Sequence, residues 1–336
     1  MKRFFAKPVI AVWALVGAGV LLAGTYYATQ MHVKPVGKAT LAVSVSPLSS
    51  PFFVAESLGY FEDEGLDATI LPCLGGHKCF LELLNGQADF ATSSDSVVMF
   101  NSFSNPDAFE VLTTFVKSSN DVKLVSLKPS EGSYSKQLMG KRVGVIKGSA
   151  SEYFLHLYLL IAGISYDQLS VVYGTAPSLS TQLINGDIDM AVLWEPYIYQ
   201  ANQALPELYI LDTSGLYDLS FNLLTHAGPA DEATQAKQLA LLRALIKATQ
   251  YINEEPKAAQ KIIYQRLRKT PDFIEWIWPD LRFQLTLDYG LLSELESQAR
   301  WAMETGIVNA TEIPDYLQVL NGKPLAEVAP DTATLQ

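Results

Sequence analysis

Apolar residues along the chain alternate between short runs typical of buried strands and longer segments with helical spacing. In the first part of the chain this pattern predicts a strand at residues 40–45, a helix at 51–64 and a strand at 67–71. In the second part it predicts the same order, with a strand at 142–146, a helix at 151–162 and a strand at 169–173. Strands that alternate with helices at this spacing predict an α/β protein with mostly parallel sheets, covered by helices on both faces.

A nine-residue segment occurs twice, 100 residues apart, at 83–91 and 183–191, with five of the nine positions identical. In both copies apolar residues precede an Asn-Gly pair, and an aspartate then leads into an apolar strand. Gly86 and Gly186 can adopt the left-handed conformation that ends a helix. The repeat therefore predicts two similar α/β lobes.

After residue 222 the pattern changes to long helical segments, at residues 233–254, 256–268, 287–304 and 312–320. Apolar residues recur at spacings of three and four in the first of them, which predicts a stripe packed on a lobe. We expect this helical C-terminal tail, with Trp276, Trp278 and Trp301, to pack against the first lobe.

The N-terminal segment differs from the rest, because Lys2, Arg3 and Lys7 precede a stretch without any charge from residue 8 to residue 31. Residues 8–28 are long enough to span a bilayer, which takes about 20 residues. We expect residues 1–31 to be a membrane anchor; the alternatives are a cleaved signal peptide and a buried core helix. Thr25 stands where a lipoprotein would carry its lipidated cysteine, so lipidation at that position is excluded.

Length and charge limit the function further. The 336 residues suffice for two domains with filled cores, and only 18% of the residues are charged. The net charge is −11, and removal of residues 1–28, with their three positive charges, would leave −14. Nucleic-acid binding requires a basic surface, so we expect no nucleic-acid partner.

The chain has two cysteines, Cys73 and Cys79, six positions apart. In an oxidising compartment such a close pair tends to be bonded, and we predict a disulfide. Two free thiols are one alternative. A metal site with His77 as a third ligand is another, although this spacing is atypical of one, and we expect no metal.

Ligands of open parallel sheets bind beyond the carboxyl ends of the strands. The loops predicted there are rich in Ser, Thr and Gly, which predicts a site of neutral hydrogen-bond donors; they span residues 46–52, 73–77, 92–96, 118–120, 147–151, 174–178 and 193–197. In one of them Gly148 permits close backbone approach, and Ser149 or Ser151 can cap the next helix. This turn predicts either an anion site at a helix start or a plain capping turn.

Two other residues in these loops each have two interpretations. Trp194 either presents its ring to a ligand or packs at the edge of a lobe. Asp95 either binds a ligand ammonium or caps the helix that follows, and aspartate is a preferred cap residue.

Together, residues 51–67, the repeated Asn-Gly-x-x-Asp, residues 140–151 and residues 191–197 resemble the nitrate/sulfonate/taurine and thiamine-precursor (pyrimidine) family of ABC-transporter substrate-binding proteins. The resemblance implies the two-lobed periplasmic binding-protein fold of type II. Lobe I would comprise residues 40–130 and 220–336, and lobe II residues 131–219. The chain would cross between the lobes near residues 127–133 and 214–222.

By position, the resemblance places the ligand contacts at Ser46, Ser49, Ser93, Ser94, Ser118, Gly148, Ser149, Ala150, Ser151 and Trp194. It implies closure of the lobes around a small-molecule solute, without a cofactor, by a monomer. The implied partners are an ABC permease and ATPase in the inner membrane. The loop between the cysteines and the N-terminal segment depart from the usual member of the family.

We therefore expect a solute-binding protein in the periplasm, tethered to the inner membrane by residues 8–28, that holds a small organic anion such as a sulfonate or taurine at the helix start after Gly148. A pyrimidine thiamine precursor, nitrate or bicarbonate is the alternative ligand. A membrane-anchored sensor is the alternative function. We expect no enzymatic activity, because the sequence contains no nucleophile elbow, phosphate loop or zinc-protease motif.

Overall fold

The computed structural model describes residues 34–128, 138–213 and 215–335. Residues 1–35 and 36–336 are separate units, and the fold is that of the second unit. The predicted anchor or signal at residues 1–31 lies outside the described residues. Residues 129–137, which include part of the expected first crossing, and residue 214 lie outside them as well.

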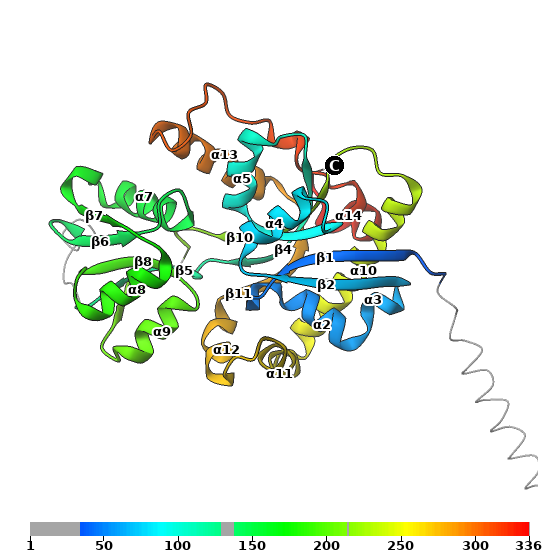
Figure 1. Ribbon diagram of the computed structural model, residues 1–336, viewed down its shortest axis with the longest axis horizontal. Helices are drawn as coiled ribbons and strands as arrows, with labels where there is room; N and C mark the ends of the chain where they lie inside the picture. The colour runs from blue at the N-terminus through cyan, green and yellow to red at the C-terminus, as the bar shows by residue number, and fades with distance from the viewer. Residues whose placement is uncertain (1–33, 129–137, 214, 336) are drawn as a thin grey trace, which may run out of the picture. The chain divides into compact units, whose positions relative to one another are not determined.

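The strands form two sheets, which Figure 1 shows side by side within the second unit. Sheet A has six strands in the order β11 (Leu281–Thr286), β4 (Phe109–Ser118), β10 (Leu219–His226), β3 (Phe90–Ser94), β1 (Gly37–Ser44) and β2 (Leu66–Cys73). Sheet B has five, in the order β7 (Ser170–Tyr173), β6 (Arg142–Val145), β8 (Met190–Trp194), β5 (Val122–Ser126) and β9 (Tyr209–Ile210).

The two sheets repeat one arrangement. In sheet A, β1 pairs in parallel with β2 and β3, and in sheet B, β6 pairs in parallel with β7 and β8. The next strand is antiparallel in both, β10 beside β3 and β5 beside β8. The predicted α/β fold of two sheets flanked by helices is confirmed, although both sheets are mixed, since β10, β4 and β11 in sheet A and β5 and β9 in sheet B make antiparallel pairs.

The repeated aspartate has the same structural role in both sheets. Asp89 accepts a hydrogen bond from the backbone N–H of Thr40 at 2.7 Å, and Asp189 accepts one from the N–H of Arg142 at 2.9 Å. Gly86 and Gly186, just before, have φ of +67° and +79°, the left-handed conformation that the sequence predicted. Each repeat thus ends a helix and ties the turn to the central parallel strand.

Helices cover both faces of sheet A (Figure 1). One face carries α4 (Gly76–Leu84), α5 (Asp95–Ser104) and α13 (Tyr289–Glu304), and the other carries α2 (Ser50–Leu58), α3 (Tyr60–Asp63), α10 (Glu232–Glu254) and α11 (Pro256–Leu267). The chain continues through α12 (Pro271–Ile277) and ends with α14 (Lys323–Val328). The C-terminal tail therefore packs on the sheet of the first part, as the sequence predicted.

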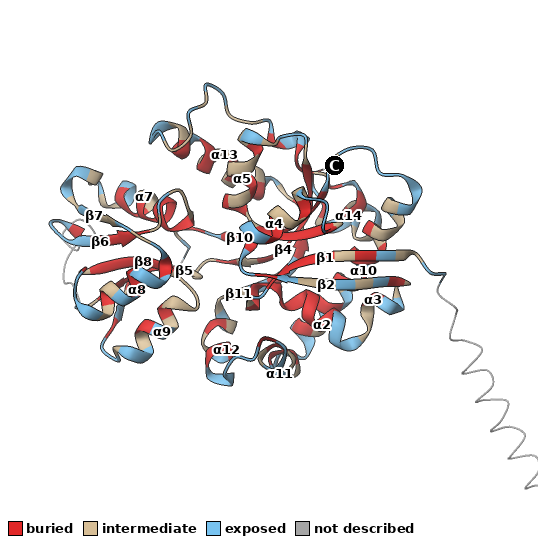
Figure 2. Ribbon diagram, in the orientation of Figure 1, coloured by how far each residue is buried: buried red, intermediate tan, exposed pale blue. Residues whose placement is uncertain are grey.

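Sheet B is covered by α7 (Ala150–Ala162), α8 (Ala176–Asn185) and α9 (Tyr197–Ala204). Its residues belong to two apolar clusters. One includes the α7 residues Tyr153 and Phe154 and is continuous with the core of sheet A, whereas the other contains Leu179, Leu183 and Ile198 of α8 and α9. Figure 2 shows that buried residues concentrate on the strands and on the helix faces turned towards them.

The chain passes between the sheets twice. Strand β4 ends at Ser118 and β5 begins at Val122, so the first crossing consists of three residues, earlier than the expected 127–133. The second lies between β9 and β10, at residues 211–218, close to the expected 214–222. Strand β5, which we assigned to lobe I, pairs with β8 in sheet B. The assignment was wrong because β8 is distant from β5 in sequence, and only the fold brings the two strands together.

Two expected helices differ in the structure, and one strand was not expected. The helix at 51–64 is divided into α2 and α3 by Gly59, whose φ of +75° ends the first helix. The segment at 312–320 contains only a 3-10 turn, Tyr316–Gln318. Between the expected helices of the tail, β11 adds an antiparallel edge strand to β4.

Cys73 and Cys79 form a disulfide, with their Cα atoms 5.4 Å apart, between the end of β2 and the first turn of α4. The same turn packs tightly on β3, because a Cβ placed on Gly76 would lie 3.0 Å from the Cα of Ser93. The disulfide therefore fixes a loop at the carboxyl edge of sheet A.

Reduction of this disulfide is predicted to lower the free energy of unfolding by about 2 kcal/mol, because a short closed loop restricts the unfolded chain. Urea denaturation with and without dithiothreitol measures the difference. The control is the double variant Cys73→Ser/Cys79→Ser, which should not respond to the reductant. Equal stability of the oxidised and reduced wild-type protein would contradict the prediction.

Candidate functional site

The carboxyl ends of the parallel strands of both sheets lie beside the first crossing. In sheet A, Ser94 ends β3 and Ser118 ends β4, and both flank the start of β10, opposite Phe221 and Leu219. In sheet B, Trp194 ends β8 and pairs with Val122, the first residue of β5. Because three residues join Ser118 to Val122, the two edges adjoin there, which is where open sheets bind ligands.

The predicted serines on the edge of sheet A are placed there, but most of their hydroxyl groups bind the chain itself. Ser46 accepts a hydrogen bond from the N–H of Leu48, and Ser93 donates to the carbonyl of Gly76 at 3.2 Å. The Ser94 hydroxyl lies 3.1 Å from that of Ser96, and the Ser118 hydroxyl accepts from the N–H of Asn120. The buried Ser49 hydroxyl has no hydrogen-bond partner among the described residues.

On the edge of sheet B, the turn from Gly148 to Ser151 caps α7. Gly148 has φ of +62°, Ser149 is the N-cap residue and accepts from the N–H of Ser151, and Ala150 begins the helix. The Ser151 hydroxyl donates to the carbonyl of Val192 at 2.7 Å, which ties the turn to β8. Ser149 therefore caps α7, and contact of this turn with a ligand anion stays a prediction.

One N–H group of this turn, that of Gly148, is already bound by a carboxylate of the chain. The N–H of Gly148 donates to Glu152 Oε2 at 2.7 Å, and the hydroxyl of Tyr173 donates to its Oε1 at 2.7 Å. Glu152 is buried in the first turn of α7, where a negative charge is favoured by the helix dipole. A ligand oxyanion at Gly148 would have to displace this side chain.

Trp194 is half-buried and packs against both apolar clusters of sheet B. This is the contact expected of a tryptophan at the edge of a lobe. Asp95 likewise makes contacts within the chain, since it accepts hydrogen bonds from the N–H of Ser96 at 2.7 Å and from the hydroxyl of Tyr217 at 2.7 Å. Contact of either side chain with a ligand stays a prediction.

A cavity of about 70 Å³ lies where the two edges adjoin. Its lining comes from the loop after β1, the first crossing, the end of β8 and the segment from α11 to β11. The lining residues are Val45, Ser46, Pro47, Leu48, Asp121, Glu195, Pro196, Lys269, Phe273, Ile277 and Leu281. Ser46 is the sequence-predicted contact residue in this lining. Burial and the charge of Glu195 raise the pKa of Asp121 to about 7.

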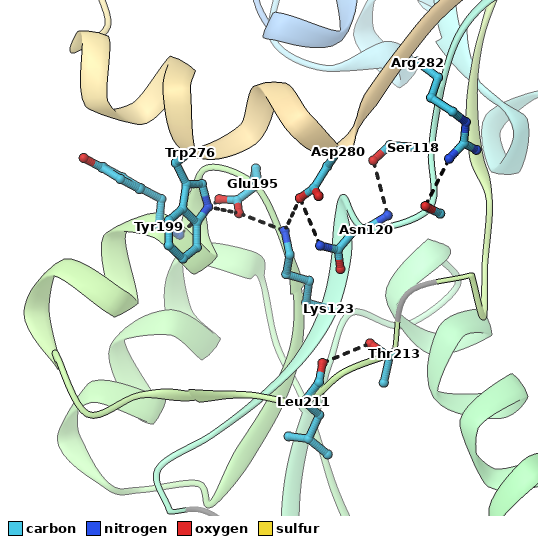
Figure 3. A network of polar contacts seen from close by, with 11 residues as sticks. Ser118, Asn120, Lys123, Glu195, Tyr199, Leu211, Thr213, Trp276, Asp280 and Arg282 are labelled. Carbon is cyan, nitrogen blue, oxygen red and sulfur yellow. Dashed lines mark hydrogen bonds and ion pairs between the residues drawn. The ribbon is translucent and has the colours of Figure 1, made fainter.

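Glu195 also belongs to a network of polar side chains, which Figure 3 shows. Lys123 of β5 places its Nζ 3.3 Å from Glu195 Oε1 and 3.2 Å from Asp280 Oδ2. Glu195 also accepts from Trp276 Nε1 at 2.7 Å, and Asp280 accepts from Asn120 Nδ2 at 3.0 Å. The network connects β5 and β8 of sheet B with the segment that follows α12.

The roles of Lys123, Asp121 and Glu195 were not predicted from the sequence. A signal for Lys123 exists, since it is a charged residue within the otherwise apolar strand Val122–Ser126, and such a residue needs a buried partner. Glu195 directly follows Trp194, and the prediction for this loop considered the tryptophan ring and not the carboxylate beside it. Nothing local distinguishes Asp121 from an ordinary loop aspartate.

A second set of contacts joins α7 to α13 on the other side of the crossing. The hydroxyl of Tyr153 donates to Ser297 at 3.2 Å, and its ring contacts those of Tyr217 and Trp301 with centroids 5.6 and 5.2 Å away. Asp95 is buried beside this cluster. Burial and the nearby charge of Glu294 raise the pKa of Asp95 to about 7.

Among residues 34–128, 138–213 and 215–335, no helix is both long and apolar enough to cross a bilayer. No group of three or more His, Cys, Asp or Glu side chains in these ranges is arranged to hold a metal ion.

Comparisons with known proteins give a consistent picture. A family model described as NMT1/THI5 like matches residues 46–259. The periplasmic aliphatic sulphonate binding protein SsuA from Escherichia coli has a similar fold, with a TM-score of 0.71 and 17% identity over 85% of this chain and 92% of that one. The alkanesulfonate-binding protein SsuA from Xanthomonas axonopodis pv. citri, bound to MOPS, gives 0.66 and 16% over 85% and 98%.

A curated relative, YtlA of Bacillus subtilis (strain 168), is 28% identical over 127 residues, which are 34% of this chain and 36% of that protein. The chain therefore spans about a third of the length of the curated relative it matches.

Stability is predicted to fall as the pH rises towards 7. The unfolded pKa of an aspartate is about 3.9, whereas that of Asp95 in the folded protein is about 7. The folded state thus binds an extra proton between these values, and the free energy of unfolding decreases with rising pH by up to about 1.4 kcal/mol per pH unit for this group.

The variant Asp95→Asn isolates this contribution, because it cannot titrate and its amide oxygen can still accept from Tyr217. Urea denaturation between pH 5 and pH 7.5 should show a shallower decrease for the variant than for the wild-type protein. Identical pH dependence of the two proteins would exclude Asp95 as a source.

Proposed function

The chain belongs to the NMT1/THI5-like family, and we propose that it is the extracytoplasmic solute-binding component of an ABC importer. The observation that carries the proposal is the pair of sheets with one strand arrangement, adjoining at their carboxyl edges and joined by two crossings. Two lobes connected in this way can close on a solute at the edges and release it by opening. The chain is thus a binding protein and not an enzyme.

The proposed lobes follow the sheets. Lobe I comprises sheet A with the C-terminal tail, and lobe II comprises sheet B; the crossings at residues 119–121 and 211–218 serve as the hinge. The partners we propose are the permease and ATPase of the importer, served by a monomer in the periplasm. Tethering to the inner membrane by residues 8–28 is part of the proposal and rests on their uncharged composition.

The ligand we propose is a small organic solute with an amino group, such as taurine or another aminosulfonate. Asp121 and Glu195 line the cavity, and the pKa of Asp121 is raised because its charge is buried beside that of Glu195. An ammonium group next to Asp121 would stabilise the ionised carboxylate. The apolar lining, with Phe273 and Ile277, suits the carbon part of the solute.

The alternative ligand is an aminopyrimidine related to thiamine precursors, which would donate from its exocyclic amine to the same carboxylate. Nitrate and bicarbonate fit less well, because two carboxylates, those of Asp121 and Glu195, line the cavity against a single cation, Lys269. A sulfonate without an amine also fits less well, since Glu152 already accepts the hydrogen bond from Gly148 that an oxyanion would need.

Matched ligand pairs test the class of solute. We expect taurine or 4-aminopyrimidine to raise the melting temperature, and ethanesulfonate or pyrimidine, which lack the amine, to have little effect. A ligand at about 100 times its dissociation constant stabilises by about 2.7 kcal/mol. Asp121→Asn should remove the shift, and Asp187→Asn, on the exposed surface of sheet B, is the control. A larger shift with ethanesulfonate than with taurine would refute the amine requirement.

Closure of the lobes is tested by small-angle X-ray scattering. The radius of gyration should decrease when the ligand identified by thermal shift is added at saturation, because the ligand favours the closed state over open ones. Asp121→Asn at the same concentration of ligand should keep the larger radius. An unchanged radius in the wild-type protein under saturation would count against a hinge function.

A further inference from the structure

A larger cavity, of about 540 Å³, lies at the opposite end of sheet A. Glu110, near the start of β4, is in its lining, whereas Ser118, at the end of the same strand, lies at the crossing. Eight residue-to-residue steps along the strand lead from Glu110 to Ser118, a distance of about 26 Å. This cavity is therefore distinct from the proposed solute site, and its volume is within the range of small-molecule sites.

The cavity lies between the start of α10 and the C-terminal segment. The first wall includes Gln235 and Gln238, and the second includes Leu317, Leu320 and the first turns of α14. Asn321 lies between them and donates from Nδ2 to Glu110 Oε1 at 2.9 Å. Lys323 and Glu327 are exposed on α14 at this cavity.

Two polar side chains in the lining are largely buried. Gln238 is 2% exposed and Glu110 is 8% exposed. Asn321 donates to one of the two carboxylate oxygens of Glu110, Oε1. Burial raises the pKa of Glu110, although Asn321 and the charge of Lys323 oppose the shift. The cavity therefore presents a largely buried carboxylate and a buried amide to a molecule that enters it.

We propose that this cavity binds an aliphatic primary amine. An ammonium group has three donors, so one group can donate to the carboxylate of Glu110 and to the amide oxygen of Gln238. The methylene chain would then contact Leu317, Leu320 and Pro324, which supply the apolar part of the lining. The site is independent of the solute site at the crossing, because none of its residues lines that cavity.

The experiment compares n-butylamine with 1-butanol, which has the same carbon chain but no charge, by isothermal titration calorimetry on the full chain at pH 7.5. We expect saturable binding of the amine and none of the alcohol. Glu110→Gln should weaken amine binding at least tenfold, and Gln238→Met, of similar size, should weaken it several-fold. Melting temperatures check that both variants fold.

A second readout separates this proposal from the proposed function. Glu110→Gln should leave the thermal shift with taurine or 4-aminopyrimidine unchanged, since Glu110 lies far from the crossing. Equal binding of the amine and the alcohol would overturn the proposal, as would absence of saturable amine binding. Amine binding that Asp121→Asn abolishes and Glu110→Gln preserves would place the amine at the crossing and would also overturn it.

Discussion

The arrangement of the two sheets depends on the neutralisation of one buried ammonium group at the first crossing. Lys123 is held between Glu195 at the end of β8 and Asp280 after α12, and all three side chains are largely removed from solvent. A buried charge without such partners would be strongly unfavourable. Glu195 follows β8 of sheet B, whereas Asp280 precedes β11 of sheet A. The two ion pairs of Lys123 therefore also fix how β5 and β8 lie relative to the segment that precedes β11.

The chemistry of the proposed solute site follows from the same requirement. The carboxylates that neutralise Lys123 bring negative charge to the crossing. Asp121, two residues before Lys123, places a third carboxyl group there. An importer protein with an overall negative charge would be expected to use neutral donors for an anion, and the helix start after Gly148 offers that type of site. In this protein Glu152 occupies that helix start, so the acceptors at the crossing decide the ligand class that we propose.

The sequence was sufficient for the architecture because the signals that define it are local. Gly86 and Gly186 end helices by their own backbone preference, and Asp89 and Asp189 bind backbone groups of neighbouring strands, so the repeat predicted two like sheets. It was insufficient where distant segments decide the outcome. The pairing of β5 with β8, the edge strand β11 and the partners of Lys123 all depend on contacts that no local pattern contains. The acceptor for Gly148 was missed for a different reason, since Glu152 is close in sequence but its side-chain direction is set by Tyr173.

The two faces of sheet B differ in how their apolar clusters are connected to the rest of the core, and this difference affects local unfolding. The cluster beneath α7 is continuous with the core of sheet A, whereas the cluster beneath α8 and α9 is separate, and Trp194 and Trp276 contact both. Opening of α8 and α9 exposes only the smaller cluster, so backbone amides there can exchange hydrogen with solvent while the rest of the protein stays folded. Amides of α7 have no such route, because releasing that helix disrupts the core shared with sheet A.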